Sequence, residues 1–106
     1  MTLRERAWHV TLLTQLVQLE EFRRKDLGFE ESERHTVQRA LSSMEDLGWL
    51  YRETTTGGVW EPGIVARYVF GEEQLSPEEE EKLDEHLEPV AEQIGIPLDE
   101  LKEQLR

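Results

Sequence analysis

The chain has 106 residues, of which 37 % are apolar and 34 % are charged, and it contains no cysteine. This length fits one domain with a single modest core, and the lack of cysteine excludes disulfides, thiol catalysis and cysteine-ligated zinc. The formal charge of −12 argues against a polyanionic partner for the chain as a whole.

The acidic charge is concentrated at one end of the chain. From Gly71 onward the sequence holds 13 of the 24 acidic side chains but only 3 of the 12 basic ones, so residues 1–70 have a formal charge of −2. Charges separated by more than a Debye length, about 8 Å at physiological ionic strength, are largely screened. An acidic tail directed away from DNA therefore does not prevent binding by the front of the chain, although it weakens non-specific binding.

No run of about 18 apolar residues occurs, which argues against a membrane-spanning helix. The amino terminus lacks the apolar run and the small-residue cleavage site of a secretory signal. We therefore expect a cytoplasmic protein.

The first predicted element is an amphipathic helix from about Leu3 to Glu21. At about 3.6 residues per turn its apolar residues form two stripes on nearly opposite sides. One stripe contains Trp8, Leu12, Leu16 and Leu19, and the other contains Leu3, Val10, Leu13 and Val17. Two apolar faces need two partners, so we expect one to pack on the domain and the other to meet the carboxy-terminal helices or a second copy. A single broadly buried helix is the alternative.

Residues 20–34 predict a short second helix and a polar turn, with Gly28 as the helix terminator. The expected core contacts of this segment are Phe22, Leu27 and Phe29. The segment also contains the densest basic cluster of the chain, which comprises Arg23, Arg24 and Lys25. This cluster either contacts phosphates or is a solvated face balanced by the neighbouring acids.

A third helix is expected from about Glu33 to Leu47, because apolar residues recur at spacings of three and four. They are Val37, Ala40, Leu41, Met44 and Leu47. The other face has no acid before Glu45, and it carries Arg34, His35, Thr36, Gln38, Arg39, Ser42 and Ser43. In a major groove, Arg39 suits guanine, Gln38 suits adenine, and the hydroxyl groups suit phosphates or a thymine methyl. The alternative is an ordinary exposed polar face.

A short hairpin should follow, since Gly48 suits a helix end and two strand-forming segments flank a pair of glycines. The predicted strands are Trp49–Thr54 and Val59–Glu61. Their connecting loop has an acid-free tip that contains Thr54, Thr55, Thr56, Gly57 and Gly58. With Arg52, this tip offers donors to a phosphate backbone; a plain hairpin without a binding role is the alternative. Pro62 and Gly63 end the ribbon, and a short apolar helix containing Ile64, Val65, Tyr68, Val69 and Phe70 closes the core.

This order of elements is that of a winged helix-turn-helix. The chain from about Arg4 to Gly71 resembles the DNA-binding domain of the IclR-type winged-helix transcription regulators. The matching stretches are Arg34–Leu41, Glu45–Leu50 and Trp60–Val65. The resemblance implies that His35, Thr36, Gln38 and Arg39 occupy DNA-reading positions. The segment Phe22–Phe29 departs from the family in lacking an alanine-rich second helix. The sequence also lacks the family's effector-binding domain, so we expect no small-molecule sensor.

The tail begins with its own helix-start signal. Ser76 suits the N-cap, Pro77 the first helical position and Glu79 the capping box. The helix has an apolar stripe, which Pro89 should kink or divide, made of Leu83, Leu87, Val90, Ala91 and Ile94. Gly95 and Pro97 precede a last helix that carries Leu98, Leu101 and Leu105. These stripes either pack on the first helix or pair across a two-fold axis in a dimer. A third possibility is that the acidic tail binds a basic protein or covers the DNA-binding face.

Together these patterns predict a mainly α fold with a small β-hairpin wing (α+β). We expect a winged helix-turn-helix domain over residues 1–71 and an acidic helical extension over residues 72–106. The expected function is that of a small, sequence-specific transcription regulator that binds double-stranded DNA as a homodimer through its first and carboxy-terminal helices. The alternative is a winged-helix module that binds a protein through its acidic surface. We expect no enzyme, cofactor or metal, because the three histidines lie on separate predicted helices and no catalytic motif occurs.

Overall fold

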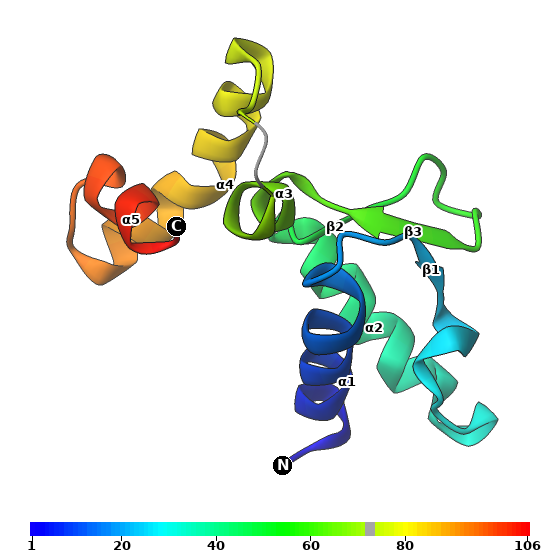
Figure 1. Cartoon of the computed structure of the whole chain (residues 1–106). Helices are drawn as coiled ribbons and strands as arrows, with labels where there is room; N and C mark the ends of the chain where they lie inside the picture. The colour runs from blue at the N-terminus through cyan, green and yellow to red at the C-terminus, as the bar shows by residue number, and fades with distance from the viewer. Residues whose placement is uncertain (72–73) are drawn as a thin grey trace.

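The computed structural model describes residues 1–71 and 74–106 as a mainly helical protein with a small three-stranded antiparallel sheet (Figure 1). This confirms the mainly α class with a small β element. The predicted domain boundary between residues 71 and 72 falls at residues 72–73, which lie outside the described residues. In the described part of the chain, every helix is too short or too polar to cross a bilayer.

The first helix is shorter than predicted. Helix α1 (Leu3–Thr11) continues into a π-helical turn (Leu12–Leu16), whose wider spacing changes the direction of the side chains. Leu19 then has a φ of +56°, a left-handed conformation that few non-glycine residues adopt, and it ends the helical path. The predicted end at Glu21 was therefore wrong. The second predicted apolar face is covered only in part, because Val10 packs against the core whereas Leu13 remains 71 % exposed and Val17 47 % exposed.

The predicted second helix was also wrong. Phe22 and Arg23 form strand β1, and the segments Arg24–Leu27 and Glu31–Glu33 are single 3₁₀ turns. The first turn starts where the Arg23 N–H donates to the Asp26 carboxylate, and it stops at Gly28, which has a φ of +80°. The terminator role of Gly28 is confirmed. Phe22 and Leu27 are buried as expected, and Phe29 is partly buried against the same core.

Helix α2 (Arg34–Asp46) matches the predicted third helix closely. Its inner face packs against α1 and the sheet through Val37, Ala40, Leu41 and Met44, all fully buried. Leu47 was wrongly assigned to this core. The helix ends at Asp46, before Gly48 turns the backbone at a φ of +87°, so Leu47 is left 48 % exposed.

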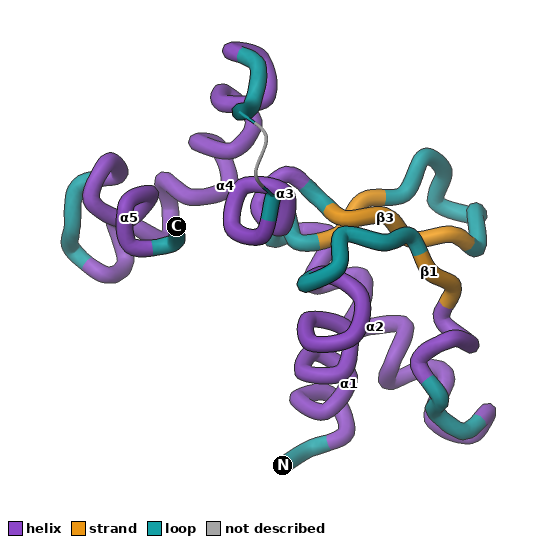
Figure 2. The backbone as a smooth tube through the Cα atoms, viewed as in Figure 1, coloured by secondary structure: helices purple, strands orange, loops and turns teal. Residues whose placement is uncertain are grey.

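Strand β3 (Val59–Pro62) lies between β1 (Phe22–Arg23) and β2 (Leu50–Tyr51) in the sheet. Phe22 is opposite Trp60, and Leu50 is opposite Pro62. The strand before the loop is shorter than predicted, because residues 52–54 leave the ladder. Figures 1 and 2 show the β2–β3 hairpin and its loop projecting from the helices on one side.

The end of α2 and the start of α3 (Ile64–Phe70) meet in a close backbone contact. The Gly48 carbonyl occupies the space that a Cβ at Gly63 would need, so residue 63 has to be glycine. The Gly63 N–H donates to the Trp49 carbonyl at 2.8 Å, and the Val65 N–H donates to the Gly48 carbonyl at 2.9 Å. These bonds fix the short apolar helix, which was predicted from its sequence, directly behind the sheet.

The tail forms α4 (Pro77–Ile94) and α5 (Leu98–Gln104). The predicted helix start is confirmed, since the Ser76 hydroxyl accepts from the Glu79 N–H and the Glu79 carboxylate accepts from the Ser76 N–H. Of the two effects expected of Pro89, a kink or a division, the division does not occur, because α4 is continuous through this residue. Proline has no N–H to donate to the carbonyl four residues earlier, which here belongs to the exposed Glu85.

A second core cluster joins the tail to α3. Its buried members are Val65, Tyr68, Leu83, Leu87, Ala91 and Leu101, and Trp49 packs against both this cluster and the first one. Most of the apolar residues of the tail are thus covered by α3 and by each other, and not by α1 as we had considered, whereas Ile94 remains 59 % exposed.

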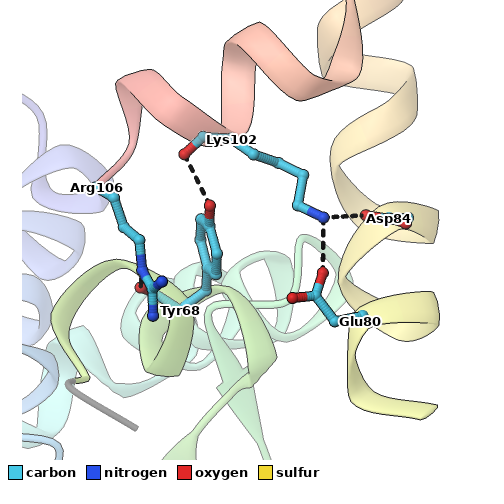
Figure 3. Close-up of polar contacts among 5 residues, drawn as sticks. All are labelled: Tyr68, Glu80, Asp84, Lys102 and Arg106. Atoms are coloured by element: carbon cyan, nitrogen blue, oxygen red, sulfur yellow. Dashed lines mark hydrogen bonds and ion pairs between the residues drawn. The ribbon is translucent and has the colours of Figure 1, made fainter. Parts of the chain in front are cut away.

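A group of polar contacts fastens α5 to α3 and α4 (Figure 3). The Lys102 ammonium donates to Glu80 at 2.7 Å and to Asp84 at 2.9 Å. The Tyr68 hydroxyl donates to the Lys102 carbonyl at 2.9 Å, and the Arg106 guanidinium lies 4.7 Å from the centre of the Tyr68 ring. The hydrogen bond to Glu80 and the one to Asp84 raise the pKa of Lys102 to about 12.

We predict that Lys102→Met destabilises the fold by on the order of 1–2 kcal/mol near neutral pH. The pKa of about 12 in the folded chain lies above the ordinary value of 10.5. The contribution is therefore complete below pH 10.5 and is lost as the pH rises through about 12. Thermal unfolding at pH 8 and in alkaline buffer checks both statements. Lys82→Met, which removes an exposed lysine of α4, is the control, and an equal loss in the two variants contradicts the prediction.

Candidate nucleic-acid interface

A basic groove lies between α2 and the loop of the hairpin. It has a volume of about 260 Å³ and is lined by Arg23, Arg24, Lys25, Gln38, Gly57, Gly58 and Trp60. The cations come from β1 and the turn after it, Gln38 from α2, and the glycines from the loop. The groove thus brings together three segments that are far apart in the sequence.

The pairing of β1 with β3 puts the basic cluster beside the loop. Arg23 is opposite Val59, the residue after Gly58. One guanidinium nitrogen of Arg23 lies 3.0 Å from the position that a Cβ at Gly58 would take. A side chain at residue 58 would therefore press on Arg23, and glycine leaves the groove open.

Positive charge remains available in this groove. Arg24 has only a long contact of 3.8 Å with Glu31, and the Asp26 carboxylate is occupied by the Arg23 backbone N–H. Lys25 is exposed, and within residues 1–71 and 74–106 it has no salt-bridge partner.

The other face of the hairpin is acidic. A second groove, of about 320 Å³, is lined there by Glu21, Glu53 and Glu61 together with loop residues. Adjacent residues of a strand point to opposite faces of a sheet. Trp60 lines the basic groove and Glu61 the acidic one, so the two grooves flank the hairpin on its two faces. Only the basic face suits a polyanion.

The outer face of α2 is open beside the basic groove. His35 and Arg39 are exposed and lie about one helical turn apart, and Ser42 is partly exposed in the following turn. No ion pair involves Arg39 anywhere in the described chain. Gln38 lies on the groove side of this face. These four residues meet the geometric requirement for reading base edges, which is a free polar side chain on an exposed helix.

Three other predicted site residues flank this stripe. Thr36 and Ser43 are partly exposed, and the Ser43 hydroxyl accepts from the Arg4 guanidinium of α1 at 2.8 Å. Arg34, the first residue of α2, donates to Glu31 at 3.1 Å and remains exposed. A phosphate would have to compete with Glu31 for this arginine.

The structure gives Arg52 a different environment from the free phosphate donor that we expected. Its side chain is 15 % exposed, and its Nε donates to Glu45 at 3.1 Å. The guanidinium stacks 4.5 Å from the Trp60 ring centre, and its Nη1 donates to the Thr55 carbonyl at 3.2 Å. Arg52 therefore ties the loop to α2 and the sheet. The loop residues Thr54, Thr55 and Thr56 are exposed, so their hydroxyl groups stay accessible.

Two sets of basic residues near the candidate interface were ranked low or missed in the sequence analysis. The cluster Arg23–Lys25 was ranked as secondary, with a solvated face as the favoured interpretation, and Arg4 was not identified as a site residue. The dense basic charge was a usable signal for the cluster, but its place beside the loop depends on the β1–β3 pairing. Nothing in the local sequence indicates that Arg4 reaches Ser43.

The chain matches no protein-family model, no curated protein and no solved structure. Within the described residues, no group of three or more histidine, aspartate or glutamate side chains is placed to hold a metal ion. The interface therefore rests on its own geometry.

We predict that Arg52→Ala lowers the free energy of unfolding by about 1–2 kcal/mol, because it removes a part-buried ion pair and a cation–π contact together. Arg39→Ala is the matched control, since this exposed arginine has no such partners, and it should change the stability by less than about 0.5 kcal/mol. Urea denaturation of both variants checks this. Equal stability of the two variants would show that Arg52 does not hold the loop.

Proposed function

We propose that this chain is a small, sequence-specific DNA-binding transcription regulator of the winged helix-turn-helix type. In this proposal α2 enters the major groove and the β2–β3 hairpin lies on the sugar–phosphate backbone. The carrying observation is the basic groove, in which cations of the β1 segment, Gln38 of α2 and the glycines of the loop converge. The resemblance of residues from about Arg4 to Gly71 to the IclR-type DNA-binding domain supports the same proposal.

The order of elements supports the winged-helix interpretation. A helix, a strand, a turn segment, a second long helix and a two-stranded ribbon follow one another, with β3 between the other two strands. The turn segment between β1 and α2 stands where a helix-turn-helix has its second helix, and here it consists of 3₁₀ turns. At about 1.5 Å per residue α2 is about 20 Å long, which suits a major groove about 12 Å wide.

Base reading is assigned to the outer stripe of α2. Arg39 is the best candidate because it is exposed and free of ion pairs in the described chain, and a bidentate arginine–guanine contact is the commonest specific one. Gln38 is suited to adenine, and His35 and Ser42 extend the stripe. Asp46 is exposed at the carboxyl end of the helix, so DNA should approach the first three turns.

Backbone binding is assigned to the groove and the loop. Arg23, Arg24 and Lys25 supply charge, and the exposed threonines of the loop supply neutral donors. Arg52 has a positioning role in this scheme, because it holds the loop while its charge is used by Glu45.

The acidic tail does not stand in the way of this binding mode. Figure 1 shows α4 and α5 on the other side of α3 from the hairpin. Screening over a Debye length of about 8 Å weakens the repulsion that their carboxylates exert on a distant duplex. The tail should reduce non-specific binding and so favour discrimination between sequences.

A second candidate function is docking of a basic protein on α4. Glu78, Glu81, Glu85, Glu88 and Glu92 are all exposed and recur every three or four residues, so they form one stripe along the outer face of this helix. The stripe is opposite the buried residues that hold α4 on α3. A protein-binding module that does not engage DNA would use this surface.

The first test is selection from a random DNA duplex pool, followed by affinity measurements at several salt concentrations. We predict an enriched motif, and for Arg39→Ala a loss of about 1–3 kcal/mol with relaxed specificity at one base position. Lys25→Ala should weaken binding to all sequences and reduce the salt slope by about one. Lys82→Ala, on the tail helix, is the matched control and should change neither quantity.

The same experiment separates the two functions. Without enrichment at low salt the DNA proposal fails and docking on α4 becomes the better proposal. Enrichment that is unaffected by Arg39→Ala and Lys25→Ala would mean that another surface binds DNA.

A further inference from the structure

The outward side of the first helical segment exposes apolar side chains that do not pack in the core. Leu13 is 71 % exposed and lies in the π-helical turn that continues α1, and Val17, which directly follows this turn, is 47 % exposed. The opposite side of the helix packs into the protein interior through three fully buried residues, Ala7, Thr11 and Leu16. The monomer therefore gains no packing from Leu13.

Two grooves lie along this part of the chain. The groove on the side of α1 has a volume of about 360 Å³ and is lined by Arg4, Glu5, Trp8, His9 and Leu12. The one beyond the helix end, of about 440 Å³, includes Val17, Leu19, Phe70 and Leu75 in its lining. Val17 thus belongs to the lining of one groove, whereas Leu13 follows Leu12 of the other groove in the sequence and lines neither.

The same helix lacks charge where the rest of the chain is rich in it. Residues 7–19 contain no Asp, Glu, Lys or Arg, although 34 % of the whole chain is charged. The solvated side of a helix normally carries charges, whereas the centre of a protein interface is depleted in them. These 13 residues carry no charge although one side of them is exposed in the monomer. This indicates that the exposed side is buried in an interface with another protein chain.

We propose that this side of α1 and of the π-helical turn after it binds the same surface of a second copy of this chain, in an antiparallel arrangement around a two-fold axis near Leu13. The charges at the two ends of the uncharged stretch favour a copy as the occupant. Arg4, Glu5 and Arg6 precede the stretch and carry a net charge of +1, and Glu20 and Glu21 follow it. Antiparallel pairing sets the basic end of each helix beside the acidic end of the other, twice by symmetry.

Parallel pairing, in contrast, would bring like charges together at both ends. Within the chain Arg6 already pairs with Glu33 at 3.1 Å, so Arg4, whose hydrogen-bond partner is the neutral Ser43, retains more of its charge for the partner. The macrodipoles of two antiparallel helices are also favourably arranged. The end charges and the helix dipoles thus both favour the antiparallel arrangement.

The size of the surface sets the expected strength. Two helical segments of about 20 Å each bury only a small area when they pack side by side, if the grooves beside them are not counted. Interfaces below about 1,200 Å² of total buried area are weak or transient. We therefore expect a dimer with a micromolar dissociation constant.

Sedimentation equilibrium of the full chain, without DNA, tests the proposal, so that its failure is distinguishable from failure of the DNA-binding proposal. The wild-type chain should be a monomer–dimer equilibrium, and Leu13→Glu should raise the dissociation constant more than about tenfold, because it buries an unpaired carboxylate. Ile94→Glu is the matched control, since Ile94 is 59 % exposed on the tail, and it should leave the constant unchanged. A chain that stays monomeric at every concentration overturns the proposal.

Cross-linking tests the position of the axis even if Leu13→Glu fails to fold. The chain has no cysteine, so a single introduced cysteine reports on its own surroundings. Residues on a two-fold axis face their own copies, and a disulfide requires the two Cβ atoms to lie about 3.5–4.5 Å apart. Leu13→Cys should therefore form a covalent dimer under mild oxidation much faster than Ile94→Cys. Equal rates in the two variants, or a faster rate at residue 94, overturn the proposal.

Discussion

The pairing of β1 with β3 is the constraint on which the candidate interface depends. Phe22 opposite Trp60 closes the core beneath the sheet, and the next residue, Arg23, is carried to the base of the loop. Strand β1 is only two residues long, and the turn with Arg24 and Lys25 follows it directly. These two cations are therefore also held near the base of the loop. The stack of Arg52 on Trp60 then ties the loop to β3, the strand with which β1 pairs. One short ladder thus positions both walls of the basic groove.

The distribution of charge gives this geometry its functional meaning. The hairpin has a basic face beside α2 and an acidic face opposite, and the most acidic segment of the chain is packed on α3 through a separate core cluster. The tail is built by its own signals, the Ser76 capping box and the bonds of Lys102 to Glu80 and Asp84. The Ser76 N–H and the Arg67 guanidinium lower the pKa of Glu79, which keeps this cap ionised. A basic groove and a strongly acidic tail therefore coexist in one small chain.

Periodicity and end signals in the sequence were sufficient for α2, α3 and α4, because each has a clear apolar stripe and a glycine, serine or proline at its end. They were insufficient at residues 20–34, where a strand and two 3₁₀ turns replaced the expected helix. The strand exists only through its partner β3, which lies far away in the sequence. The exposed stripe of α2 was predicted correctly from the absence of acids, whereas the commitment of Arg52 to Glu45 and Trp60 depends on tertiary contacts that no local pattern reveals.

The most direct test of the central claim is to follow the backbone amide resonances of the chain by NMR while a selected duplex is added. The account predicts that shifts concentrate on three segments, Arg23–Lys25, the first three turns of α2, and Gly57–Gly58, and that α4 is unaffected. Shifts confined to α4, or shifts on α2 without the Arg23–Lys25 segment, would contradict it, because the strand pairing would then not create the binding surface.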